Sequence, residues 1–215
     1  MKITALTSEI SLKRQLEQGN EQQLQTVREV IADVRAKGDV AIKYYSEKWD
    51  GFAPENLRVS LHEITQAVKN FDPQLVQDLQ EAADNIRLYH NEQKRNGFQL
   101  PLQDGSYLAQ RITALDAVGL YVPGGSAAYP SSVLMNVIPA QVAGVKRIVI
   151  TSPAGKDGKL PDAVLVAAHI LGVTEIYKAG GAQAIAALAY GTETIAAVDK
   201  ITGPGNIFVA LAKRE

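Results

Sequence analysis

Three short glycine-containing turns are the places where this sequence could perform chemistry. Each follows an apolar, strand-like run and precedes a helix-like run; the turns are Val122-Pro123-Gly124-Gly125-Ser126, Ala179-Gly180-Gly181-Ala182-Gln183 and Thr202-Gly203-Pro204-Gly205-Asn206. Glycine permits positive φ and lets a ligand approach the backbone closely. The helix that follows offers unpaired N–H groups and a partial positive charge, which favour phosphate. Strand-to-helix turns also need glycine for purely structural reasons, so the glycines alone leave both interpretations open.

Three side chains at these turns are candidate ligand contacts. Tyr121 stands at the end of its predicted strand, while Gln183 and Asn206 stand where helices begin and could direct their amides into a cleft. Their ordinary roles would be a half-buried ring with a wet hydroxyl for Tyr121 and helix-end hydrogen bonding for the two amides. The three-glycine dinucleotide fingerprint is absent from all three turns, so a nucleotide would bind in a non-standard way.

The groups that are missing also limit the chemistry. The chain has no cysteine, which excludes disulfides, thiol nucleophiles and cysteine-ligated metal. Its three histidines, His62, His90 and His169, form no pair with metal-ligand spacing, and His169 is predicted to be a hydrogen-bonded core residue. No nucleophile-elbow motif is present. The residues therefore predict no catalytic residue and no metal site in this chain.

The hydrophobic pattern predicts two regions with different secondary structure. Residues 1–100 read as a helical segment, with helices around Leu24–Val34, after Asp39, after Ser60 and from Asp72-Pro73 towards Gly97. Residues 101–215 alternate strands with helices, which predicts an α/β, Rossmann-like, mostly parallel sheet with helices on both faces. Ligands of such sheets bind beyond the carboxyl ends of the strands. The predicted strands are Tyr107–Leu115, Val118–Val122, Arg147–Thr151, Glu175–Ala179 and Lys200–Thr202, and the predicted helices are Ser131–Ala143, Asp162–Leu171, Gly181–Tyr190 and Ile207 onward.

Composition excludes several classes of protein. The 215 residues are 46% hydrophobic and 21% charged, and the formal net charge is −1. Such a balance gives no electrostatic reason to bind nucleic acid or an anionic membrane. No run approaches the length of a membrane-spanning helix, and charges return at Lys13 before any signal-like apolar stretch. The sequence therefore predicts a cytoplasmic protein.

Two long stretches resemble histidinol dehydrogenase. They are GLYVPGGSAAYPSSVLMNVIPAQVAGVKRIVITSP and AGGAQAIAALAYGTETIAAVDKITGPGNIFVALAKRE, and VRAKGDVAIKYYSEKWDG in the amino-terminal half fits as well. The loop GKDGKL looks longer than is common in the family. The resemblance covers essentially the whole chain, but it corresponds only to about the first half of the family's usual length.

The resemblance implies an activity, cofactors and a partner. The family oxidises L-histidinol to L-histidine through an aldehyde, using two NAD and a zinc ion, as a cytoplasmic homodimer. It assigns NAD contacts to Tyr121, Gln183 and Asn206. The resemblance places the zinc ligands, the Glu-His base pair and most substrate contacts after Glu215. The helix predicted from Ile207 onward also reaches Glu215 without a terminating glycine. We therefore expect an incomplete fold that is inactive alone.

Two alternative functions remain open at this stage. The chain could be a shortened paralogue that binds a nucleotide or pairs with another chain. It could also be an interaction module that self-associates through apolar surface left uncovered by truncation, since large exposed apolar patches drive association.

Overall fold

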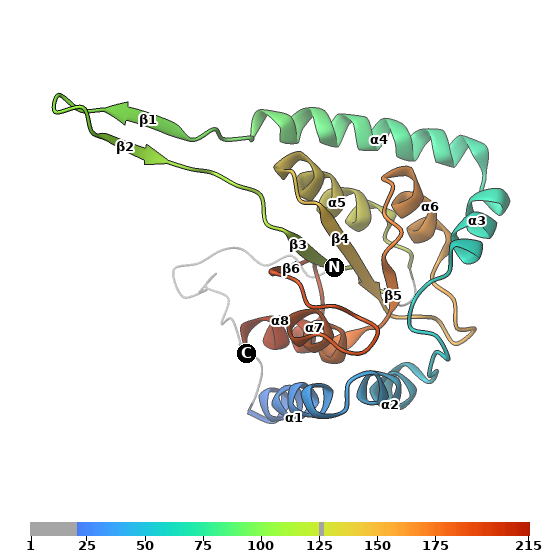
Figure 1. The fold of residues 1–215 in the computed structure, drawn as a ribbon. Helices are drawn as coiled ribbons and strands as arrows, with labels where there is room; N and C mark the ends of the chain where they lie inside the picture. The colour runs from blue at the N-terminus through green and yellow to red at the C-terminus, as the bar shows by residue number, and fades with distance from the viewer. Residues whose placement is uncertain (1–20, 125–126) are drawn as a thin grey trace, which may run out of the picture.

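The computed structural model describes residues 21–124 and 127–215 and confirms the α/β fold (Figure 1). Its centre is a four-stranded parallel sheet in the order β5-β4-β3-β6. Leu120 of β3 lies opposite Ile150 of β4 on one side and Thr202 of β6 on the other, so the three strands end close together. The strands are β3 (Ala117–Tyr121), β4 (Arg147–Ser152), β5 (Ile176–Lys178) and β6 (Lys200–Thr202).

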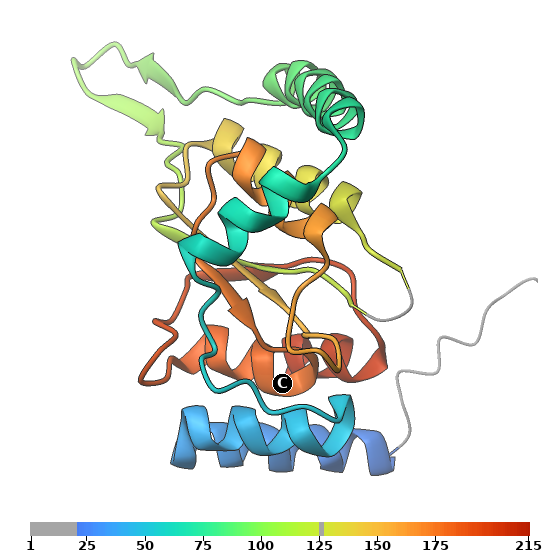
Figure 2. The ribbon, with the colours of Figure 1, turned by 90° about the vertical axis from the view of Figure 1, so that its right-hand side faces the viewer.

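Helices cover both faces of the sheet in two layers each, as Figures 1 and 2 show. On one face, α5 and α6 contact the sheet side, and α4 and α3 pack outside them. On the other face, α7 and α8 are covered by α1 and α2. The helices are α1 (Glu21–Lys37), α2 (Asp39–Asp50), α3 (Leu61–Asn70), α4 (Pro73–Glu92), α5 (Pro130–Ala143), α6 (Asp162–Ile170), α7 (Gly181–Tyr190) and α8 (Ile207–Arg214).

Local chemistry explains where the helices begin. Ser60 and Glu63 form the capping box that precedes α3, with the Glu63 backbone N–H donating to Ser60 Oγ over 3.2 Å. Asp72 caps α4 by accepting from the Gln74 backbone N–H over 2.8 Å, and Pro73 occupies the first helical position. These helices fix the outer layer above α5 and α6.

The region between residues 93 and 116 differs from the prediction. The helix from Pro73 ends at Glu92, and Phe98–Pro101 forms a strand, β1, that the sequence pattern missed. It pairs in antiparallel fashion with β2 (Tyr107–Gln110), which is shorter than the predicted strand Tyr107–Leu115. All eight strand residues are exposed, so neither strand shows the apolar alternation that burial imposes. The hairpin projects from the body as an arm (Figure 1).

Parts of the sequence-based predictions lie outside the described residues. These parts are the amino-terminal stretch 1–20 and the Gly125-Ser126 pair of the first glycine turn. The division into residues 1–100 and 101–215 stays a prediction. Within residues 21–124 and 127–215, no helix combines the length and apolar character that a membrane crossing requires.

Candidate ligand-binding site at the strand ends

Tyr121 joins the first glycine turn to the second. It is the last residue of β3, its side chain is buried, and its hydroxyl accepts a hydrogen bond from the backbone N–H of Gly181 over 3.1 Å. Gly181 is the first residue of α7 and has a φ of 62°. The hydroxyl therefore accepts from one of the backbone N–H groups at the start of α7 that have no partner within the helix. The Tyr121 hydroxyl is thus hydrogen-bonded within the protein, whereas its ordinary role would be a hydroxyl in contact with water.

The third turn lies directly against the end of β3. Gly203 has a φ of 115°, and a Cβ atom placed there would stand 2.1 Å from the carbonyl oxygen of Tyr121. No side chain fits in that space. Lys213 of α8 donates from Nζ to the carbonyl of Gly203 over 2.8 Å and so ties the turn to the helix that follows it. Gly203 therefore permits close backbone packing, which is the purely structural role that the sequence left open for the turn glycines.

Pro153, just beyond β4, separates the first two turns. A Cβ atom on Gly124 would lie 2.6 Å from Pro153 Cγ, and one on Gly180 would lie 2.5 Å from Pro153 Cβ. The turns after β3 and β5 are thus packed against this one proline, and the turn after β6 is packed against the backbone of Tyr121. This packing brings the turns to one edge of the sheet, as the parallel topology predicts.

A cavity of about 640 Å³ opens at this edge. Its walls include Tyr121, Gly124, Gly181 and Asn206, so all three turns contribute. Residues of the loop 154–159 also line the cavity, among them Lys156, Asp157 and Lys159. The volume lies within the range of small-molecule and cofactor sites.

Asn206 has the capping role, one of the two that the sequence left open, while its contact with a ligand stays a prediction. It is the N-cap of α8, and its Oδ1 accepts from the backbone N–H of Val209 over 3.1 Å. It is also exposed and lines the cavity. The cap uses the amide oxygen, which leaves the amide nitrogen available to donate to a ligand.

Gln183 lies behind the cavity and is not among the residues that line it. Its side chain is 1% exposed, and Oε1 accepts no hydrogen bond from the described residues. A Cβ atom on Gly181 would lie 2.6 Å from this oxygen, so the amide folds back against the start of its own helix. A buried acceptor without a donor is costly, which makes this atom a candidate for pairing with a ligand or water.

Asp50 is a cavity residue that sequence analysis missed. It ends α2, is partly buried and lines the cavity, yet its carboxylate makes no hydrogen bond or ion pair with any described residue. Burial raises the pKa of this carboxyl. The pKa of Tyr121 is also raised, first by burial and further by the charge of Asp50, although the Gly181 N–H acts in the opposite direction. No local motif marks Asp50, because the fold brings it to the strand ends from the helical region.

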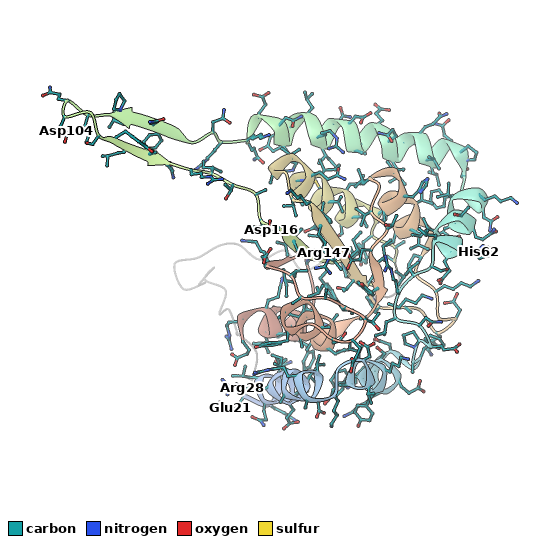
Figure 3. The ribbon with its side chains drawn as sticks, in the orientation of Figure 1. Glu21, Arg28, His62, Asp104, Asp116 and Arg147 are labelled. Atoms are coloured by element: carbon teal, nitrogen blue, oxygen red, sulfur yellow. The ribbon has the colours of Figure 1, made fainter. Side chains whose placement is uncertain are left out.

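The described residues offer no metal centre. No group of three or more His, Cys, Asp or Glu side chains among them could hold an ion. The prediction that His169 is a core residue was wrong, because its side chain on α6 is exposed. Figure 3 places His62 on α3 at the outer surface of the molecule, and none of the three histidines lines the cavity. The histidines therefore add nothing to the cavity.

Comparisons with known proteins agree on one family. The family profile described as histidinol dehydrogenase matches residues 13–215. Histidinol dehydrogenase of Geobacillus kaustophilus is 60% identical over 215 residues, covering 100% of this chain and 51% of that protein. The Bacillus subtilis histidinol dehydrogenase is 55% identical over 217 residues, again covering 100% of this chain and 51% of the relative.

A solved structure gives the same result in three dimensions. The crystal structure of histidinol dehydrogenase from Elizabethkingia anophelis matches with a TM-score of 0.87 and 40% sequence identity, covering 91% of this chain and 45% of that one. The chain thus spans about half the length of the relatives it matches, and it corresponds to their amino-terminal half.

Proposed function

The chain belongs to the histidinol dehydrogenase family, and from that premise we propose that it forms the NAD-binding half of an enzyme that oxidises L-histidinol to L-histidine. The single observation that carries this proposal is the cavity at the strand ends. It joins Tyr121, Gly181 and Asn206 at the edge where α/β sheets bind their ligands.

The residues present fit a dinucleotide. Gly124 and Gly181 keep the backbone bare at the cavity, and the start of α7 supplies N–H groups and a partial positive charge for phosphate. Lys156 and Lys159 also line the cavity and supply positive charge beside the carboxylates of Asp50 and Asp157. Tyr121 and Asn206 are proposed to contact NAD directly. Gln183 is proposed to reach it through its unpaired oxygen, either by a change of rotamer or through a bound water.

NAD, when bound, supplies the acceptor for the hydride that leaves the alcohol carbon. The protein groups named above hold and orient it. The described residues do not fit a zinc ion, so no step through that metal is assigned to them. We propose that zinc binding, the proton-accepting base and most histidinol contacts belong to the other half of the family's architecture. This chain alone is then expected to bind NAD without turnover.

A chimera tests the proposal. The chain would be joined to the carboxyl-terminal half of the Geobacillus kaustophilus relative and assayed for NADH production with histidinol and zinc. We expect the chimera to turn over and the chain alone to remain inactive. A chimera that folds and binds zinc but makes no NADH, beside an active Geobacillus enzyme, would contradict the assignment. Activity of the chain alone would contradict the proposal that zinc binding, the base and most histidinol contacts belong to the other half.

The exposed arm favours a second candidate function, self-association. Leu100, Tyr107 and Leu108 on β1 and β2 are each more than half exposed, at 51%, 61% and 58%. A two-stranded hairpin is marginally stable in water, so a partner surface would stabilise it. A second copy of the chain is the partner proposed here. Light scattering should show a dimer that the double variant L100S/L108S converts to a monomer; a monomer in both would remove this candidate.

Cytoplasmic location and the homodimeric state of the complete enzyme remain predictions from the family. Cell fractionation and sedimentation of the complete enzyme would test them.

A further inference from the structure

A separate cavity lies at the base of the arm and has a volume of about 590 Å³. Part of its wall comes from the two segments that join the arm to the body, residues 93–97 before β1 and residues 112–115 after β2. Residues of α5, β3 and β6 supply most of the rest. The cavity shares no lining residue with the one at the strand ends, so it needs an explanation of its own.

The floor of this cavity is apolar and uncovered. Ile112, Leu115 and Met135 line it, and these side chains are 47%, 42% and 52% exposed. Single apolar side chains are common on protein surfaces, but apolar side chains gathered in a hollow are typical of a binding site. The cavity at the base of the arm therefore has the character of a docking site.

The charges around the floor have one sign. Lys94, Arg95 and Lys200 line the cavity, whereas no aspartate or glutamate among the described residues does. The side chains of these three cations form no hydrogen bond or ion pair with any described residue. A partner that covers the floor must also bring negative charge to the cations, because complementary charge favours the correct partner over others. The matching segment is thus apolar and carries a carboxylate.

The outer part of the arm has both features. Leu100 lies opposite Leu108 in the hairpin register, and Leu102 lies nearer the tip; the three are 51%, 58% and 41% exposed. Asp104 stands at the tip, as Figure 3 shows. Its Oδ1 accepts from the Ser106 hydroxyl over 2.6 Å and from the Ser106 backbone N–H over 3.0 Å, and these bonds lower the pKa of the carboxyl. The tip therefore keeps its negative charge at neutral pH.

An arm cannot fill the cavity at its own base, because β1 and β2 carry the tip away from the body (Figure 1). A second copy can fill it. When two copies related by a two-fold axis place their arms antiparallel, each tip lies over the base of the partner's arm, and the same contact is made twice. The symmetry of a pair thus brings the apolar, acidic tip to the apolar, basic cavity.

We propose that the cavity at the base of the arm is the docking site for the arm tip of a second copy, with Leu102 against the apolar floor and Asp104 beside Lys94 and Arg95. The inference rests on the proposed self-association through the arm. It adds the surface that receives the arm and the charges that orient it.

Two single-cysteine variants locate the docking site. The chain has no cysteine, so a disulfide between a Leu102→Cys chain and an Ala114→Cys chain can only join two copies. Ala114 lines the cavity. Under mild oxidation we expect this mixed pair to form at least about tenfold faster than a control pair of Leu102→Cys with Leu75→Cys, which lies at the other end of α4. Mass spectrometry of the linked peptides identifies the residues joined.

A charge exchange tests the ionic contact. Asp104→Lys and the double variant K94E/R95E should each weaken dimerisation about tenfold or more, because each brings like charges together. Combining all three substitutions reverses both signs, so the dimer dissociation constant should return to within about threefold of wild type. Lys69→Glu, at an exposed position in the last turn of α3, is the control and should leave the constant unchanged. Sedimentation equilibrium measures the constants, and circular dichroism checks that each variant is folded.

The outcomes separate this inference from the proposal on which it rests. If the chain is a dimer that L100S/L108S converts to a monomer, but the Leu102→Cys and Ala114→Cys pair forms no faster than the control pair, the docking site is wrong and self-association through the arm stands. A triple charge variant as weak as its parents also overturns the docking site. If the wild-type chain is a monomer, both proposals fail together.

Discussion

The hydroxyl of Tyr121 accepts the backbone N–H of Gly181 over 3.1 Å, and this contact fastens the end of β3 to the beginning of α7. The Tyr121 side chain at the end of β3 thereby pairs with a backbone amide at the positive end of α7. The contact links the stability of the sheet edge to the groups available for a ligand. Several measurements can therefore test it.

Removal of the hydroxyl should weaken the fold. Tyr121→Phe leaves the partly buried Gly181 N–H without its acceptor, which should lower the free energy of unfolding by about 1 kcal/mol. Urea denaturation measures this change. Tyr89→Phe, at an exposed position on α4, is the matched control and should cost almost nothing. Equal stabilities for the two variants would show that the Tyr121 hydroxyl makes no useful bond.

A side chain at Gly203 should disrupt the turn. Gly203→Ala places a Cβ atom 2.1 Å from the Tyr121 carbonyl oxygen at a φ of 115°. We expect a loss of about 2 kcal/mol or more and a loss of NAD binding. Gly105→Ala is the control, because Gly105 has a φ of 85° and no atom within 4 Å of the added Cβ, so it carries backbone strain without a clash. If the two variants are equally stable, the close approach is unimportant.

Asn206 allows its capping role to be separated from its proposed ligand role. Asn206→Asp keeps an oxygen for the Val209 N–H but replaces the amide nitrogen, so it should retain stability and weaken NAD binding. Asn206→Ala removes both groups and should also cost about 1 kcal/mol of stability. Thermal unfolding and calorimetry with NAD measure the two effects. Full NAD affinity in Asn206→Asp would leave Asn206 as a cap alone.

A charged network at the opposite end of the sheet should make stability depend on pH. Figure 3 shows Arg147 beside Asp116 at the start of the strands, and Arg147 Nη2 donates to Glu175 Oε1 over 2.7 Å. Burial alone would raise the pKa of Glu175, but hydrogen bonds from Arg147 and Tyr177 outweigh it and hold this pKa below its ordinary value of 4.5. The unfolded chain therefore binds the proton first, and this stabilisation is lost as pH falls from about 4.5 through the folded-state pKa.

Glu175→Gln tests that network. It should lower the free energy of unfolding at pH 7 by about 1–2 kcal/mol, because Arg147 loses its charged partner in a half-buried position. The difference from wild type should shrink as pH is lowered below about 4.5. Glu81→Gln, on the exposed side of α4, controls for the loss of one charge. A difference that stays constant from pH 7 to pH 3 would exclude a depressed pKa at Glu175.

Residue patterns predicted those parts of the fold in which burial leaves a periodic trace. The apolar runs at β3 and β4 and the capping residues Ser60 and Asp72 identified strands and helix starts close to their observed positions. Strand β1 was not predicted because it is exposed on both faces, so its sequence shows no alternation of apolar and polar residues. Pairing with β2, not burial, defines it.

The site could be predicted only in part for a similar reason. The placement of Tyr121 and Asn206 at the cavity could be predicted because strand ends and helix starts can be located along the chain, and the parallel topology brings them together. Their contact with NAD stays a prediction. Gln183 was expected to point into the cleft, but it is buried behind the lining residues, which spacing alone does not reveal. Asp50 was missed because its place beside Tyr121 depends on how α2 packs across α7, a contact between distant parts of the sequence.

The most direct test of the central claim is a two-dimensional ¹H–¹⁵N NMR titration of the chain with NAD. We expect saturable shifts of the backbone amides of Gly124, Gly181 and Gly203, with the Gly181 amide responding strongly because the ligand alters its hydrogen bond to Tyr121. Saturable shifts confined to α3 or to the β1–β2 arm, with these three glycines unmoved, would contradict it. No saturable shift at any concentration of NAD would contradict it as well.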